Sequence, residues 1–134
     1  MKESIVQYSD DNYDVTITVR QASLAAAFKS YALRAKGEAE ILKREKEGGV
    51  ADMYIRYAAR RTLPELYGAT VEIINGEDAN LKLPDEMGLD EFLQLPEALI
   101  ILWERATYET NPQWMPQRKA DESGEVSEPV KNSG

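Results

Sequence analysis

The stretch of residues 90–114 most constrains the fold, because it holds both tryptophans and the longest apolar run in the chain, residues 98–103. Pro96 precedes this run. Proline is favoured at a helix start because its φ is already helical and its missing N–H is not needed there. The pair Asn111-Pro112 then ends the helix, since proline excludes the residue before it from the right-handed helical region. The sequence therefore predicts a helix of about fifteen residues, a usual length in globular proteins.

The predicted helix is apolar on more than one side, so it either lies at the centre of a core or is covered by a partner. Most apolar helices form part of a core, which is the interpretation that we favour for Leu99, Leu102 and Trp103. Trp114 lies beyond Pro112, and tryptophan is enriched at the energetic centres of interfaces. A ring that folds back onto the domain is an equal alternative for Trp114. All four apolar residues remain candidates for contact with a partner.

The N-terminal residues show the pattern of a β-hairpin. Val15, Ile17 and Val19 alternate with threonine, which is the period of a strand with one buried face. Residues 4–8 can pair with this strand, and residues 9–12 supply side chains typical of turns. Two strands alone are only marginally stable, so helices or further strands must cover the apolar face.

From about Ala22 the period of the apolar residues becomes helical, and abundant alanine favours a long helix. Gly37 weakens the middle of this helix by about 1 kcal/mol relative to alanine, so a break or kink there is an alternative. Gly48 and Gly49 end the helix. The apolar residues that fall near one of its faces are Leu24, Phe28, Tyr31, Ala35 and Leu42.

A second helix is predicted over about residues 50–63. Its arginines Arg56 and Arg60 are four positions apart and share a face beside Arg61, which makes this the only basic cluster in an acidic chain. The cluster could bind an anion or an acidic partner, so Arg56 and Arg60 are candidate partner-binding residues. Pairing with the protein's own carboxylates is the interpretation that we favour, because surface ion pairs are common and individually weak. The residues that can face the core are Val50, Tyr54, Tyr57, Ala58 and Leu63.

The second half of the chain adds one strand and two helices. Residues 70–74 favour a strand, Asn75-Gly76 is a strong turn signal, and residues 81–83 can return as a short strand. A short apolar helix over residues 89–95 leads into the long apolar one. The expected fold class is therefore α+β and predominantly helical, with a short N-terminal β-hairpin, three to four helices and one further short strand or hairpin.

A chain of 134 residues allows one domain, which we place at residues 1–114. Residues 115–134 hold no aromatic side chain and few aliphatic ones. Such a segment cannot bury enough apolar surface to offset the entropy lost on ordering. We therefore expect a disordered, polar and acidic C-terminal tail.

The composition excludes several classes of function. The net charge of −8 opposes general binding to nucleic acid or to an anionic membrane. The chain has no cysteine and no histidine, which removes thiolate chemistry, the commonest general base and the commonest metal ligands. Residues 10–14 are rich in oxygen ligands but lack an EF-hand pattern, and a hairpin turn explains them better.

No glycine-rich phosphate loop and no nucleophile elbow is present in the sequence. We therefore assign no catalytic, cofactor-binding or metal-binding residue and expect a protein that is not an enzyme. No apolar run approaches the roughly 18 residues that span a bilayer, and the N-terminus lacks the apolar region of a signal peptide. A soluble, intracellular protein is expected.

The order of the segments is distinctive. A short β N-terminus leads into an alanine-rich helix, and a middle helix ends in an arginine pair followed by Leu-Pro-Glu-Leu-Tyr-Gly-Ala-Thr, residues 63–70. An acidic, leucine-rich segment follows at residues 90–99, and the last helix ends in Asn-Pro-Gln-Trp, residues 111–114. This order resembles the small tail assembly chaperones of long-tailed bacteriophages (siphoviruses) and prophages, and the last two segments carry most of the likeness.

The resemblance implies a function without catalytic residues. A protein of this family would bind the tape measure protein in the host cell cytoplasm and keep it soluble until tail tube protein polymerises around it. It would be absent from the mature virion and could form a homo-oligomer. Two alternatives stay open: a structural or connector component of the tail, and an intracellular protein-binding regulator that uses the arginine face.

Overall fold

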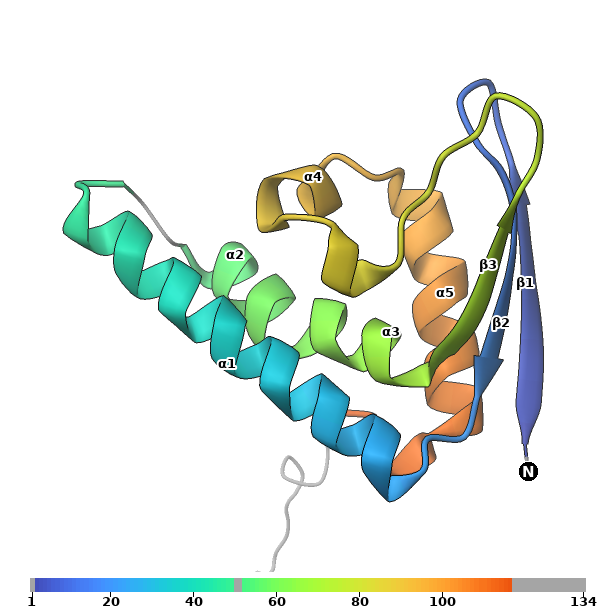
Figure 1. Ribbon diagram of the computed structural model, residues 1–134, viewed down its shortest axis with the longest axis horizontal. Coiled ribbons are helices and arrows are strands. Elements are labelled where there is room, and N and C mark those ends of the chain that lie inside the picture. Colours follow the sequence, from blue (N-terminus) through green and yellow to red (C-terminus); the bar gives the residue numbers. More distant parts are fainter. Residues whose placement is uncertain (1, 50–51, 117–134) are drawn as a thin grey trace, which may run out of the picture.

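Three antiparallel strands form a sheet, and the helices cover one of its faces (Figure 1). The computed structural model describes residues 2–49 and 52–116. Strand β1 (Glu3–Ser9) pairs with β2 (Asp14–Arg20), and β2 pairs with β3 (Thr70–Asn75), so the order in the sheet is β1-β2-β3. The predicted fold class, α+β with a short N-terminal hairpin and mostly helices, is confirmed.

The hairpin forms where the alternation predicts it. Val15, Ile17 and Val19 are buried on the side of the sheet that the helices cover. The carboxylate of Asp10 closes the turn, because its Oδ1 accepts hydrogen bonds from the backbone N–H groups of Asn12 (2.7 Å) and Tyr13 (2.8 Å). The acidic residues between the strands therefore serve the turn, as expected.

Helix α1 (Leu24–Lys46) runs without a break along the outer edge of the molecule (Figure 1). Ser23 caps it, since its side chain accepts a hydrogen bond from the N–H of Ala26 at 3.2 Å. The alternative of a break at Gly37 is wrong. A Cβ at Gly37 would lie 2.7 Å from the carbonyl oxygen of Ala59, so glycine is needed there for the close approach of two helices.

The second predicted helix extends further than expected. It comprises α2 (Met53–Tyr57), a π-helical segment (Ala58–Thr62) and α3 (Leu63–Ala69), which follow one another directly. The π-helical segment lies just before Pro64, a residue that has no N–H to donate. The chain therefore continues as a helix through Pro64 and beyond residue 63, its predicted end. Val50, its expected start, lies outside the described residues.

The central helix of the fold is α5 (Glu97–Thr110), which packs on β1, β2 and α3. It begins after Pro96 and ends at Asn111, as predicted. The short helix α4 (Leu89–Leu93) precedes it, and buries Leu89 and Phe92. Figure 1 shows α5 between the sheet and the other helices. Among the described residues, no helix is long and apolar enough to cross a membrane.

Two local predictions are wrong. Residues 81–83 do not form a strand. The backbone of Leu81 bonds to the side chain of Asn75 instead: the Leu81 N–H donates to Asn75 Oδ1 at 2.7 Å, and Asn75 Nδ2 donates to the Leu81 carbonyl at 3.0 Å. Tyr54 and Tyr57 do not face the core, and their exposed fractions are 78% and 45%. The small residues of this helix take the inner positions instead, since they allow α1 to approach closely.

Replacing Gly37 with alanine is expected to destabilise the protein, although alanine is the better helix former by about 1 kcal/mol. The added methyl group would collide with the Ala59 carbonyl oxygen, and the two helices would have to move apart. Urea unfolding measures the change. Ala39→Gly, at an exposed position two residues away, is the matched control and should cost about 1 kcal/mol from propensity alone. A gain in stability from Gly37→Ala would contradict the close packing.

Candidate interaction surface

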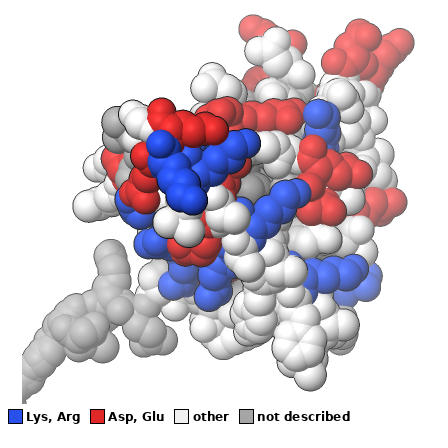
Figure 2. Space-filling view, turned by 60° about the vertical axis from the view of Figure 1, so that its left-hand side comes forward, with Lys and Arg blue, Asp and Glu red and all other residues white. Residues whose placement is uncertain are grey.

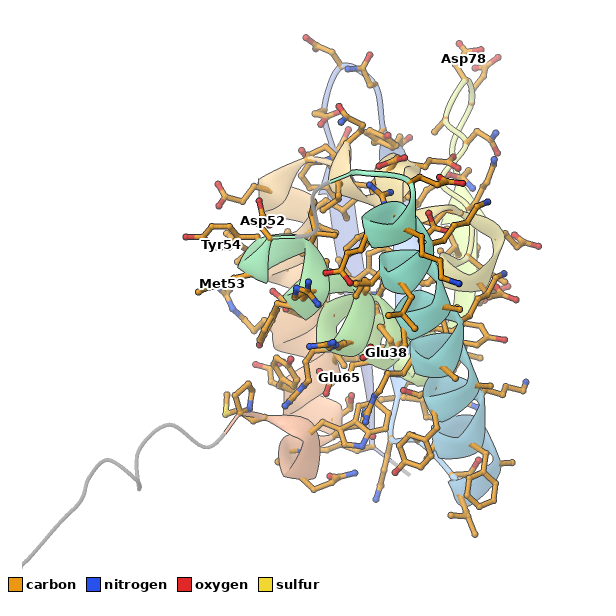
Figure 3. The ribbon with its side chains drawn as sticks, turned by 90° about the vertical axis from the view of Figure 1, so that its left-hand side faces the viewer. Glu38, Asp52, Met53, Tyr54, Glu65 and Asp78 are labelled. Carbon is orange, nitrogen blue, oxygen red and sulfur yellow. The ribbon has the colours of Figure 1, made fainter. Side chains whose placement is uncertain are left out.

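The arginine cluster is paired with the protein's own carboxylates, as we favoured. Arg56 forms an ion pair with Glu45, and Arg60 forms one with Glu38, so both pairs join α1 to the following helical segment. The hydrogen bond from Arg60 lowers the pKa of the Glu38 carboxyl. Glu38 lies on the side of α1 that faces this segment (Figure 3). Basic side chains on this face lie against acidic ones and do not form a continuous basic patch (Figure 2).

A second polar network lies deeper, around the carboxylate of Glu65, which is 5% exposed. Its oxygens accept hydrogen bonds from Arg61 Nε (3.0 Å) and from the Tyr108 hydroxyl (2.7 Å). Burial is the main cause that raises the pKa of the Tyr108 hydroxyl, and its hydrogen bond to Glu65 raises this pKa further. Burial also raises the pKa of the Glu104 carboxyl. The network joins α3 to α5, which is a structural role.

Trp114 folds back onto the domain and is partly buried. Its backbone carbonyl accepts a hydrogen bond from Arg61 Nη2 at 2.7 Å. A Cβ at Gly68 would lie 3.1 Å from the Trp114 ring and 3.0 Å from the Cβ of Ser30, so the ring packs in the space that a glycine leaves. Of the two alternatives for Trp114, the folded-back one is therefore correct.

Leu99 and Trp103 are core residues with no exposed surface. The prediction that they could contact a partner directly is therefore wrong. The indole Nε1 of Trp103 donates to Thr70 Oγ1 at 2.9 Å, which satisfies the polar atom of a buried ring. Leu102 is partly buried and borders a hollow next to β1. The core interpretation of α5 is the correct one, because α5 has the sheet on one side and α3 on the other.

Several large apolar side chains of α1 are exposed. We call the side on which they lie the outer face and define it by the five residues that the sequence places on one side of this helix. Four of them have exposed fractions of 71%, 58%, 49% and 60%: Leu24, Phe28, Tyr31 and Leu42. Ala35, the fifth, is exposed as well. The predicted apolar stripe of α1 therefore faces solvent.

The opposite side of α1 packs on the body of the protein. Ser30 and Ile41 are buried there, Leu33 is partly buried, and Gly37 contacts Ala59. Small residues at these positions let α3 and the π-helical segment come close. Helix α1 therefore has two faces that can pack, and only the inner one is covered by described residues.

The N-terminal half of the outer face continues towards Trp114. The rings of Phe28 and Tyr31 lie 6.2 Å apart, and the guanidinium of Arg34 stacks 5.5 Å from the centre of the Tyr31 ring. A shallow hollow of about 430 Å³ lies between Tyr31 and Arg34 on one side and Trp114 on the other. Sequence reasoning assigned the outer face no role, because it did not reveal which side of α1 is covered.

A second exposed apolar pair lies at the start of α2. Met53 and Tyr54 have exposed fractions of 71% and 78% and point away from the rest of the molecule (Figure 3). These residues are few and stand apart from the outer face of α1. In the part of the chain that the structure describes, no group of three acidic side chains is arranged to hold a metal ion.

No family model, curated protein or solved structure matches this chain.

Proposed function

We propose that this protein is a tail assembly chaperone of a long-tailed bacteriophage or prophage. It binds the tape measure protein in the host cytoplasm, keeps this long helical chain soluble, and leaves it when tail tube protein polymerises around it. The observation that best supports the proposal is the outer face of α1, since an exposed apolar stripe of this kind is a site for another helix. The choice of this family rests on the resemblance in the order of the sequence segments.

The charge of the protein suits this role. A net charge of −8 favours solubility and disfavours self-aggregation while an apolar face stays accessible. The arginines Arg56 and Arg60 contribute less to the proposal than the outer face does, because their carboxylate partners lie on α1 itself. Contact through apolar side chains therefore remains the mode of binding with most support.

Co-expression with the tape measure protein of the same genome tests the proposal. The wild-type chain should keep that protein in the soluble fraction, and Phe28→Glu should lose most of this effect because it places a charge in the outer face. Ile5→Glu is the matched control: Ile5 is 54% exposed and lies on β1 of the sheet, not on α1. Equal precipitation of the tape measure protein with and without the wild-type chain would refute the proposal.

Mass spectrometry of purified particles separates a chaperone from a structural component of the tail. A chaperone is expected to be absent from finished virions. A fixed copy number per particle would favour the structural or connector alternative.

A further inference from the structure

We propose that Asn75 is a site of spontaneous deamidation, and that the fold controls this reaction through the connection that follows β3. Asn75-Gly76 is the single Asn-Gly pair in the chain. Glycine has no side chain to hinder the approach of its backbone nitrogen to the preceding amide, so asparagine before glycine reacts more readily than asparagine before a larger residue. The other asparagines precede tyrosine, leucine, proline or serine: Asn12, Asn80, Asn111 and Asn132.

The reaction needs water and no other reactant. The Gly76 nitrogen attacks the side-chain carbonyl carbon of Asn75, a new C–N bond forms, and Nδ2 leaves as ammonia with the proton that the Gly76 nitrogen gives up. The product is a cyclic imide. Water then opens this ring at either of its two carbonyl carbons, which leaves aspartate or isoaspartate at position 75. Both products carry a carboxylate in place of the neutral amide.

In the folded protein, hydrogen bonds hold both of the groups that react. The Gly76 N–H donates to the backbone carbonyl of Asp14 at 2.7 Å. The Asn75 amide is held at both of its ends by Leu81, because Oδ1 accepts from the Leu81 N–H at 2.7 Å and Nδ2 donates to the Leu81 carbonyl at 3.0 Å. A nitrogen bonded to Asp14 and an amide bonded to Leu81 are not free to approach each other. The connection must therefore open before the ring can close.

The connection after β3 is anchored in the core by Leu81. This side chain is 4% exposed, whereas Glu77, Asp78 and Asn80 are exposed. Release of Leu81 from the core would free the Asn75 amide while the sheet and the helices stay packed. Local openings of this kind cost less free energy than global unfolding, so they are the faster route to reaction. The packing of Leu81 thus sets the rate.

Deamidation would weaken the connection permanently. A carboxylate at position 75 has no N–H to donate to the Leu81 carbonyl, and one of its oxygens would face that carbonyl oxygen. The carboxylate of Asp14 also lies close by, since a Cβ on Gly76 would collide with it. The new negative charge would therefore be repelled by an existing one. The inference concerns the chain alone and does not depend on the proposed function.

Peptide mapping by mass spectrometry, after incubation at mildly alkaline pH, tests the site and its control by the fold. In the wild-type chain, Asn75 is expected to deamidate at least about tenfold faster in urea than in the folded state. Asn80, which precedes leucine, is the internal control and should react more slowly than Asn75 in urea. Equal rates for Asn75 and Asn80 in urea would overturn the assignment of the site. Equal rates for Asn75 with and without urea would overturn its control by the fold.

Leu81→Ala tests whether the connection is the gate. It should speed the deamidation of Asn75 without urea, because it weakens the anchor and leaves the Asn-Gly pair intact. Leu66→Ala is the matched control, since Leu66 is 1% exposed in α3 and its truncation destabilises another part of the core. Urea unfolding gives the stability of both variants. A rate that rises in both variants in proportion to the stability lost would show reaction through global unfolding and overturn the proposed gate.

Asn75→Asp reproduces one of the two products and tests its effect on the fold. This variant should unfold at a lower urea concentration than the wild type. Asn80→Asp makes the same change of charge at an exposed position, and it should unfold at the wild-type concentration. If the two variants are equally stable, deamidation does not weaken the connection, and that part of the proposal is wrong.

Discussion

Replacing Trp103 with alanine is expected to lower the free energy of unfolding by about 3–5 kcal/mol, the usual cost of removing a buried aromatic ring. Trp103 has no exposed surface and lies on α5, the helix between the sheet and α3. Its Nε1 also donates to Thr70 Oγ1, which in turn donates to the Leu66 carbonyl at 2.6 Å. The substitution thus removes both packing and a polar link at the junction of α3 and β3. Urea unfolding measures the loss, which is a large part of the stability of a typical domain.

Two further variants separate the contributions at this position. Trp103→Phe keeps a ring and removes the N–H, so it should cost clearly less than alanine. Ile101→Ala is the matched control on the same helix, because Ile101 is 47% exposed and its truncation should have a small effect. Equal losses from Trp103→Ala and Ile101→Ala would contradict the placement of Trp103 in the core.

Replacing Asn111 with alanine is expected to cost about 2–4 kcal/mol, because it leaves partly buried backbone groups without partners. Asn111 has no exposed surface. Its side chain accepts a hydrogen bond from the Ala22 N–H at 2.8 Å and donates to the Arg20 carbonyl at 3.2 Å. It therefore ties the end of α5 to the connection between β2 and α1, which are far apart in sequence.

Unfolding in urea gives the size of the Asn111→Ala effect, and amide hydrogen exchange gives its location. The Ala22 amide should exchange faster in the variant, because it has lost its acceptor. Asn12→Ala in the exposed hairpin turn is the control and should change stability by no more than about 0.5 kcal/mol. A variant with unchanged stability and unchanged exchange at Ala22 would show that Asn111 does not hold this connection.

Local physics in the sequence determined the types and limits of most elements. The alternation at Val15, Ile17 and Val19 predicted β2, and Pro96 with Asn111-Pro112 predicted both ends of α5. These signals act over a few residues, so they do not depend on the rest of the fold. The core positions Leu99 and Trp103 followed from the same pattern, since most apolar helices are used as core.

Only the tertiary structure decided which of two possible sides of a helix is covered. Periodicity identified an apolar stripe on α1, yet the side that packs inward is the one where Ser30 and Gly37 let neighbouring helices approach. Likewise, the ion pairs of Arg56 and Arg60 with glutamates of α1 depend on two helices lying side by side. Contacts between distant segments have no signature in a single sequence. For that reason the outer face of α1 became a candidate site only once the fold showed it to be exposed.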